Sequence, residues 1–264
     1  MTSTRAGVTG SSDRFAYVWS RYADLDPDYE EQFLGWISPL TPRDLRGAAI
    51  LDVGCGMGRN SYWAARAGAA SVLACDVDEA TLAVARRTLA PLKNVEVVRC
   101  SAYDLPWRDR FDIVMAIGVV HHLEDPRRAV QTMVEATKPG GTTLVWIYAR
   151  EGNVGLLRLL LPLRRVTTRL PPSLTDVLSL LVSCPLYIVV RLVAWRHPYL
   201  RRMRRWRFRH VHAVVLDQLI PRISHYWTRE DALSLFSGLL VSHVDAFRHN
   251  RNSWTVVATR RADE

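Results

Sequence analysis

The sequence predicts an α/β fold with an open, mostly parallel sheet and helices on both of its faces. Residues 48–51 form an apolar run that breaks into three closely spaced glycines and then continues as helical sequence. A second apolar run, Ser71–Cys75, ends in an acidic residue where another helix opens. A third, Phe111–Gly118, is apolar except at Asp112, as expected of a parallel strand buried on both faces. Strands that alternate with helices in this way pack as a parallel sheet covered on both sides.

The N-terminal segment precedes this core. Residues 1–13 are small and polar and lack the apolar stretch of a secretory signal, so we expect them to be disordered. Residues 14–46 are predicted to form cap helices, the first with Phe15, Trp19 and Tyr22 on one face. This helix either packs on the core or covers a ligand cavity, and both interpretations stay open.

The glycine stretch, residues 52–58, reads Asp-Val-Gly-Cys-Gly-Met-Gly between the first strand and the first core helix. Glycines adopt the unusual backbone angles of such a turn and let a ligand approach the main chain. The helix N-terminus that follows favours a negatively charged or hydroxyl-rich ligand. Asp76 ends the second strand about 20 residues further on, where an acid can accept hydrogen bonds from two ribose hydroxyls.

The remaining elements complete a sheet of seven strands. The periodicity predicts helices over 78–89, 127–137 and 228–236, and strands over 95–98, 142–147, 241–247 and 254–259. We expect the last two strands to form an antiparallel hairpin.

Three segments of the chain resemble a known family. Residues 52–58 followed by Asp76 resemble motif I and the ribose-binding acid of class I S-adenosylmethionine (SAM)-dependent methyltransferases. His121-His122-Leu-Glu-Asp-Pro resembles a segment of the ubiquinone/menaquinone C-methyltransferase-like small-molecule enzymes, and so does the Lys-Pro-Gly-Gly turn at 138–141. The resemblance implies a Rossmann-like fold with a SAM-binding core at 47–150 and a last helix and hairpin at 223–264.

The same resemblance implies SAM as the cofactor and a set of residues that contact it. Ser101 stands where the family usually has an acid that receives the adenine amino group, and a hydroxyl accepts that hydrogen bond more weakly. The implied contacts are Asp52, Gly54, Cys55, Gly56, Gly58, Asp76, Val77, Ser101, Ala102 and Ile117.

Histidines are the candidate catalytic groups. Methyl transfer is an in-line displacement that needs alignment, exclusion of water and removal of one proton. His122 follows the fourth strand and His225 precedes a late helix, and histidine titrates near neutral pH. Each is either a general base or a packing residue. We find no cluster with metal-ligand spacing and predict no metal site.

The basic charge is concentrated in one region. The net charge is +9, but residues 150–222 contain 14 arginines against Glu151, Asp176 and Asp217, which is +11, so the remainder sums to −2. We predict an Arg-rich helical insert at 151–222. It is a solvated lid, a surface for anionic lipid through Arg201–Arg209, or a nucleic-acid contact. The uncharged run 177–190, interrupted at Cys184-Pro185, is too short to span a membrane.

The four cysteines, without a Cys-x-x-Cys pair, favour a reduced cytoplasmic protein, with peripheral membrane attachment as an alternative. Together with the resemblance, these features suggest methyl transfer to an O or C atom of a small apolar or aromatic metabolite, as in secondary-metabolite tailoring. Alternatives are a quinone or lipid methyltransferase at the membrane surface, an RNA methyltransferase, and a SAM-binding protein that does not methylate. Against RNA adenine methylation, Ile117-Gly118-Val119 stands where Asn/Asp-Pro-Pro-Tyr is expected.

Overall fold

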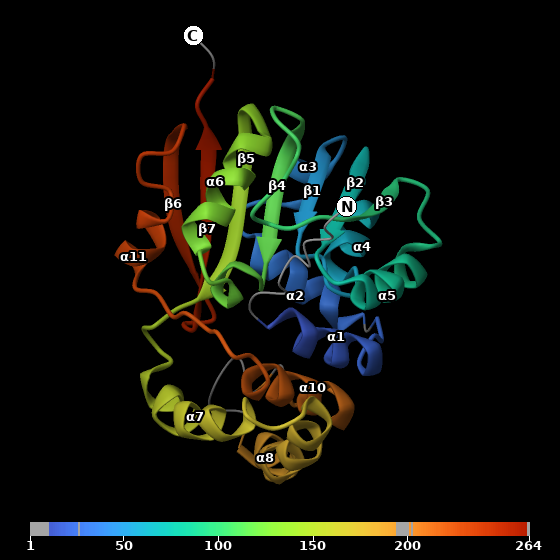
Figure 1. The fold of residues 1–264 in the computed structure, drawn as a ribbon, viewed down its shortest axis with the longest axis vertical. Coiled ribbons are helices and arrows are strands. Elements are labelled where there is room, and N and C mark those ends of the chain that lie inside the picture. The colour runs from blue at the N-terminus through green and yellow to red at the C-terminus, as the bar shows by residue number, and fades with distance from the viewer. Residues whose placement is uncertain (1–10, 26, 194–200, 202, 263–264) are drawn as a thin grey trace, which may run out of the picture.

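The computed structural model describes residues 11–25, 27–193, 201 and 203–262. Within these residues seven strands form one sheet in the order β3-β2-β1-β4-β5-β7-β6 (Figure 1). The pairs from β3 to β5 are parallel, and β7 is antiparallel to both β5 and β6. The strands are β1 (Ala49–Val53), β2 (Ser71–Asp76), β3 (Val95–Arg99), β4 (Phe111–Ile117), β5 (Thr137–Tyr148), β6 (Val241–His249) and β7 (Ser253–Arg260). The predicted mostly parallel α/β sheet with a closing hairpin is confirmed.

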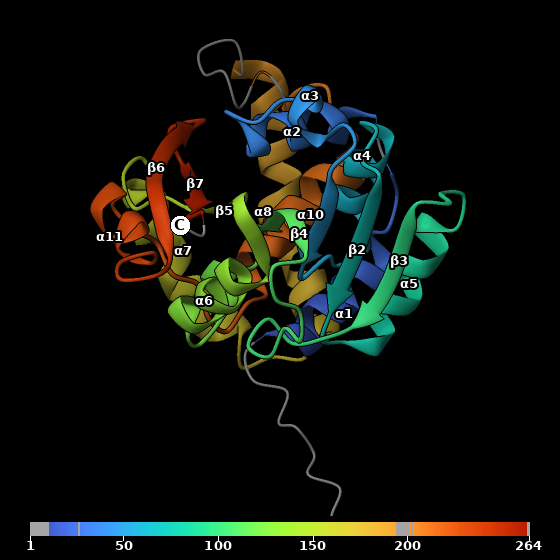
Figure 2. The ribbon, with the colours of Figure 1, turned by 90° about the horizontal axis from the view of Figure 1, so that it is seen from above.

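Helices cover both faces of the sheet because side chains on each strand alternate in direction. Ile50 of β1 packs in one core with α2 and α4, whereas Leu51 and Val53 pack in another with α6 and α11 (Figure 2). The helices of the core are α2 (Asp28–Ile37), α3 (Pro42–Leu45), α4 (Arg59–Arg66), α5 (Glu79–Leu89), α6 (Pro126–Ala136) and α11 (Arg229–Ser234), with a short 3-10 helix, η1 (Val120–His122).

The turn predicted at residues 138–141 belongs to β5. The pairing of β4 with β5 shifts register between Phe111 and Ile113, which marks a bulge opposite these residues. Gly140 has a φ of +75°, a backbone conformation that glycine adopts without strain. Strand pairing therefore begins at Thr137, earlier than the sequence pattern predicts.

Helix α1 (Ser12–Arg21) begins inside the segment expected to be disordered. Ser11 is buried, and its hydroxyl accepts a hydrogen bond from the Arg222 backbone N–H at 2.8 Å. Asp13 forms an ion pair with the Arg222 side chain at 3.4 Å. These contacts come from the far end of the chain, so the expectation of disorder is wrong for residues 11–13. The rest of that stretch, residues 1–10, lies outside the described residues.

Three helices of the insert form a layer below α1 in Figure 1: α7 (Val154–Thr167), α8 (Pro172–Val193) and α10 (Phe208–Leu219). Helix α10 lies between α1 and the other two. Leu216 and Ile220 pack on Val18 of α1, and Val215 and Leu219 pack on Leu160 of α7. Where the structure describes it, the insert is therefore made of helices and packs on the N-terminal helix; residues 194–200 and 202, the last within the predicted Arg201–Arg209 surface, lie outside the described residues.

Helix α8 continues through Cys184-Pro185, where the sequence suggested an interruption. A proline removes the hydrogen bond to the carbonyl four residues earlier, here that of Leu181. Both Leu181 and Pro185 are exposed, so this carbonyl lies on the outer side of the helix. Over Pro172–Leu192 the helix has a mean hydropathy of 1.8 and is long and apolar enough to cross a membrane. The uncharged run 177–190 was expected to be too short to span a membrane, but the helix that contains it is longer. This finding concerns length and composition alone, and 28% of the apolar stretch is buried inside the protein.

Candidate active site

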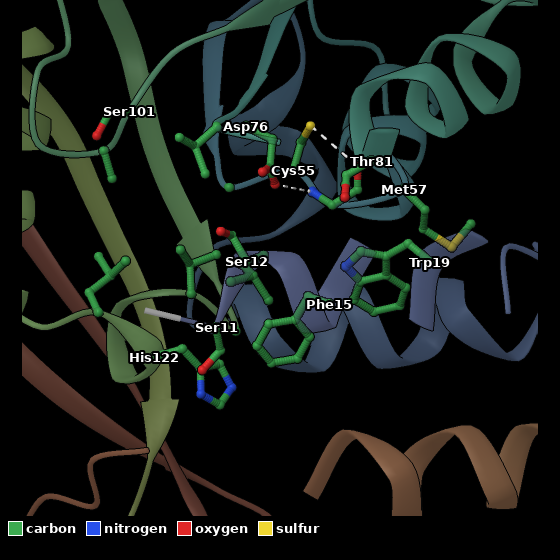
Figure 3. A pocket seen from close by; sticks show the side chains of 18 of the residues that line it. Ser11, Ser12, Phe15, Trp19, Cys55, Met57, Asp76, Thr81, Ser101 and His122 are labelled. Atoms are coloured by element: carbon green, nitrogen blue, oxygen red, sulfur yellow. Dashed lines mark hydrogen bonds between the residues drawn. The ribbon is translucent and has the colours of Figure 1, made fainter. Parts of the chain in front are cut away.

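A cavity of about 340 Å³ lies at the carboxyl ends of the parallel strands, within the range of about 300–1,000 Å³ typical of small-molecule sites. Its walls are the glycine loop after β1, the end of β2, the segments after β3 and β4, and α1 (Figure 3). Of the candidate site residues, those in the lining are Gly54, Cys55, Gly56, Asp76, Val77, Ser101, Ala102, Ile117 and the catalytic candidate His122. Asp52, Gly58 and His225 lie outside the lining.

The glycine loop brings its backbone against the cavity because all three glycines have positive φ angles. A Cβ atom on Gly54 would come within 2.6 Å of the Val119 side chain. One on Gly56 would come within 3.1 Å of the Trp19 indole nitrogen. Gly58 has a different role, since a Cβ there would lie 2.8 Å from Leu89 on α5. The first two glycines keep the cavity wall thin, and the third lets α5 pack closely.

Asp76 presents its carboxylate to this cavity from the end of β2 (Figure 3). Its Oδ2 accepts the Gly56 N–H at 3.1 Å, and its Oδ1 accepts the Asp78 N–H at 3.2 Å. Burial raises the pKa of this carboxyl, and the backbone hydrogen bonds oppose that change. The side chain is thereby fixed in orientation with acceptor capacity remaining.

Asp52 lies behind the loop. It is 1% exposed, and its Oδ2 accepts the Ser61 hydroxyl at 2.5 Å. Burial raises the pKa of Asp52 to about 6. This hydrogen bond joins β1 to α4, so the structure places Asp52 where it holds the shape of the loop from behind.

The segment after β3 contributes a carboxylate that the sequence analysis did not select. The Ser101 hydroxyl accepts the Tyr103 N–H at 3.2 Å and so is used in a local turn. Asp104, three residues later, also lines the cavity, and its carboxylate pairs with Arg128 at 3.0 Å. The only sequence signal for it is an acid in the same short loop.

Helix α1 forms the wall facing the strand ends. Ser11, Ser12, Phe15 and Trp19 line the cavity (Figure 3). Of the two interpretations of this helix, its position agrees with the one in which it covers a ligand cavity. The Phe15 ring lies 4.8 Å from the His122 ring between centroids. The two serines were missed because their segment was expected to be disordered.

His122 is held in one tautomer on the cavity wall. Its Nδ1 lies 2.8 Å from the Ile223 carbonyl oxygen, and a carbonyl can only accept, so Nδ1 carries the hydrogen. Nε2 is then the ring atom able to take a proton. Burial lowers the pKa of His122 to about 3, so the ring is neutral at physiological pH.

His121 and His225 support this segment from outside the cavity. His121 is fully buried, with its ring 3.9 Å from that of Tyr148. The His225 Nε2 bonds the Leu123 carbonyl at 2.9 Å, and its backbone N–H donates to the His121 carbonyl at 2.8 Å. His225 thus holds the segment that carries His122 through hydrogen bonds to the carbonyls on either side of it.

Asp217 of α10 is the acidic residue that the insert contributes to the cavity lining. Burial raises the pKa of its carboxyl to about 6. The carboxylate lies 3.4 Å from the Tyr148 hydroxyl, which accepts the Gln218 side-chain N–H at 2.7 Å. No local pattern identifies this residue, because its place depends on α10 folding back beneath the sheet.

Comparison with known proteins identifies the core. A family model described as a methyltransferase domain matches residues 51–145, which contain the glycine loop, Asp76 and His122. The core of this chain is a class I SAM-dependent methyltransferase domain. Its cofactor is SAM.

The methyltransferase domain has curated relatives with different acceptors in their names. The ubiquinone biosynthesis O-methyltransferase of Azotobacter vinelandii is 35% identical over 151 residues, covering 54% of this chain and 62% of that protein. The tRNA (carboxymethyluridine(34)-5-O)-methyltransferase of Arabidopsis thaliana is 31% identical over 142 residues, covering 51% and 33%. These matches span less than two thirds of the relatives' lengths.

Solved structures extend the likeness to the fold of nearly the whole chain. The magnesium protoporphyrin IX methyltransferase from Synechocystis PCC 6803, solved with bound SAH, aligns with a TM-score of 0.54 over 94% of both chains. At 12% sequence identity this alignment describes the fold alone.

Proposed function

We propose that the protein transfers the methyl group of SAM to an O or C atom of a small, apolar or aromatic acceptor. When bound, SAM supplies a methyl group on a sulfonium, ready for in-line displacement. The observation that carries the proposal is the cavity in which the glycine loop, Asp76 and His122 meet. A metabolite-tailoring role of the secondary-metabolism type agrees with a site of this size.

The walls of the cavity match the parts of SAM. The fixed carboxylate of Asp76 suits the two ribose hydroxyls, and the thin wall at Gly54 and Gly56 lets the cofactor approach the backbone. The N-terminus of α4 and the cation of Arg59 suit the methionine carboxylate. At the opposite wall, Asp104 and the Ser101–Ala102 backbone suit the adenine ring.

His122 is the group we propose to take the acceptor proton. A neutral imidazole whose Nδ1 hydrogen is held by a carbonyl can accept that proton at Nε2, and the Asp217 carboxylate in the same cavity would stabilise the imidazolium that burial otherwise disfavours. The aromatic rings of Phe15 and Trp19 line the same cavity and exclude water from it. An apolar or aromatic acceptor is favoured because these rings offer it stacking surface.

The test supplies SAM labelled in its methyl group together with a catechol, a phenol, a hydroquinone and a tRNA. We expect label in the organic extract of one or more small acceptors. His122→Ala should lower the rate about 100-fold or more while leaving the Kd for SAM within about threefold. His243→Ala, at an exposed position on β6, is the matched control. Label that enters only the tRNA would contradict the proposal.

A second candidate is a quinone or lipid methyltransferase at the membrane surface. The specific observation in its favour is that α7 and α8 present apolar side chains outward. The same assay tests it with a prenylated hydroquinone incorporated in vesicles. A rate no greater than with the unprenylated hydroquinone would count against this candidate.

A further inference from the structure

Exposed apolar side chains are concentrated on the two outer helices of the insert. Leu159 of α7 is 71% exposed, and Leu181 and Leu192 of α8 are 75% and 71% exposed. Figure 1 shows α7 and α8 at the end of the molecule opposite the C-terminus, with α10 between them and the sheet side. The other exposed large apolar side chains on these helices are Val154, Leu156, Leu161, Leu163, Val166, Leu174, Val177, Leu178, Leu180, Val182, Ile188 and Val189.

The first half of helix α8 has the reverse polarity of a helix on the surface of a water-soluble protein, whereas Val190 near its C-terminus is buried in an apolar cluster. Its inward face contains Thr175, Asp176, Ser179 and Ser183, all buried. All four form hydrogen bonds through their side chains: Thr175 donates to a carbonyl of α7, the two serines donate to carbonyls of α8 itself, and Asp176 binds groups on α1 and α10. A helix that faces water normally turns its apolar side inward and its polar side outward.

A polar cluster around Asp176 fixes this orientation. Its carboxylate binds the His212 Nε2 at 2.8 Å and the hydroxyls of Tyr17 and Tyr22 at 2.8 and 2.9 Å. The other ring nitrogen of His212 bonds the Ser183 hydroxyl at 2.8 Å. Rotating α8 to bury its apolar side would leave these groups without partners at a large energetic cost. The hydrogen bonds of Asp176 and Ser183 therefore keep the apolar side chains of α8 facing outward.

The charges around the face indicate which apolar partner it suits. From residue 152 to residue 216 the sequence contains twelve arginines and one acid, the buried Asp176. Arg158 and Arg165 are exposed and lie seven residues apart, so they share one side of α7. Arg204 and Arg205, before α10, are exposed as well. An apolar face bordered by arginines complements a bilayer containing anionic lipid.

We propose that the outward face of α7 and α8 docks on an anionic lipid bilayer, with both helices lying in the interface. Helix α8 does not cross the membrane, because Asp176 binds α1 and α10 and would otherwise enter the hydrocarbon unpaired. Insertion of the apolar side chains at the headgroup boundary removes them from water, and the arginines meet lipid phosphates. This inference deepens the second candidate function, and its test requires neither SAM nor an acceptor.

The first test is flotation with vesicles of phosphatidylcholine and phosphatidylglycerol in low salt. We expect the wild-type protein to float. The double variant Leu159→Asp/Leu181→Asp should bind at least tenfold more weakly, since both leucines project outward. Leu240→Asp, at a position 58% exposed before β6, is the matched control and should bind like the wild type. A Kd for SAM equal to that of the wild type shows that the double variant is folded.

A second measurement uses the unaltered sequence. Cys184 on α8 is the exposed cysteine among the four, so it can be labelled selectively with a polarity-sensitive fluorophore. We expect a blue shift with anionic vesicles and quenching by lipids brominated in the acyl chains.

Three results would overturn the proposal. In the first, the protein does not bind vesicles and is a dimer in solution, and the double variant is a monomer. This result would assign the face to a second copy of the chain. The second is vesicle binding unchanged in the double variant, which leaves charge alone as its cause. The third is tRNA binding without vesicle binding. A failure of methyl transfer would leave all of these readings unaffected.

Discussion

At the scale of single residues, Asp76 is the side chain on which SAM affinity should depend most. Its carboxylate is held by two backbone N–H groups and lines the cavity. Hydrogen bonds to a charged group contribute about 1.5–3 kcal/mol each. We therefore expect Asp76→Ala to weaken SAM binding about 10- to 100-fold in calorimetry. Glu79→Ala, which removes a charge outside the lining near the same strand end, is the control and should bind SAM normally.

Asp217 should determine how activity changes at acidic pH. The pKa of Asp217 is raised by burial to about 6, whereas His122, with its pKa lowered by burial to about 3, stays neutral through this range. A charged Asp217 in the same cavity stabilises the imidazolium that forms when His122 takes a proton. We expect the methyl-transfer rate to rise with pH through about 6, and Asp217→Asn to lack this inflection. An inflection that survives in Asp217→Asn but disappears in Asp52→Asn would assign the ionisation to Asp52 instead.

The same shift predicts an effect on stability with a definite sign. The folded-state pKa of Asp217, about 6, lies above the value of about 3.9 expected in the unfolded chain. Its protonated form thus favours folding below about pH 3.9, and this contribution is lost as pH rises through about 6. We expect Asp217→Asn to raise Tm by a few degrees at pH 8 and to change it little at pH 4, as measured by calorimetry. An equal change at both values would contradict the assignment.

At the scale of elements, Arg14 joins the cavity wall to the insert. Its side chain is 2% exposed. It donates to the carbonyls of Ile220 at 2.6 Å, Thr167 at 3.0 Å and Leu170 at 3.0 Å. These acceptors are the end of α10 and the turn between α7 and α8, so one side chain connects α1 to both parts of the insert.

Loss of that side chain should affect both stability and cofactor binding. Arg14→Met keeps the apolar stem but removes the guanidinium donor from three carbonyls, of which that of Thr167 keeps the Thr175 hydroxyl and the Leu170 N–H, and this should cost about 2–4 kcal/mol in urea unfolding. SAM affinity should fall as well, because Phe15 and Trp19 on the same helix line the cavity. The control Arg21→Met removes a largely exposed guanidinium from an ion pair with Asp176 at 3.6 Å, and because Asp176 keeps its hydrogen bonds to His212 and two tyrosines we expect less than about 1 kcal/mol.

The elements also differ in how far sequence could predict them. The glycine loop and Asp76 could be predicted because their chemistry depends on residues within one strand, turn and helix. Asp217 and Ser11 could not be predicted, because their positions depend on contacts between the two ends of the described chain. Ser11 is held by a hydrogen bond from Arg222, and α10, which carries Asp217, packs on Val18 of α1. Pro185 made the sequence analysis predict an interruption in α8 where there is none. The free-energy cost of a proline inside a helix depends on whether the carbonyl that loses its hydrogen bond, here that of Leu181, is exposed to solvent, and only the packed structure shows this.

At the scale of the whole molecule, the cavity and the outer helices α7 and α8 lie at the same end of the sheet, beyond the carboxyl ends of the parallel strands. The parallel strands end at the cavity, α1 closes it, and α10 connects it to the two outer helices (Figure 1). A molecule docked through α7 and α8 would hold the cavity end of the sheet toward the bilayer. We expect this orientation to shorten the path of an acceptor dissolved in the membrane to the site.

This arrangement predicts a dependence on where the acceptor resides. In anionic vesicles, we expect kcat/KM for a prenylated hydroquinone to exceed that for the short water-soluble hydroquinone at least tenfold. Leu159→Asp/Leu181→Asp should abolish this advantage and keep the rate with the soluble acceptor, because neither leucine lines the cavity. The advantage should also shrink between low salt and about 0.5 M salt, since screening weakens the contribution of the arginines. If the double variant retained the full advantage, the acceptor would reach the cavity by a route independent of membrane docking.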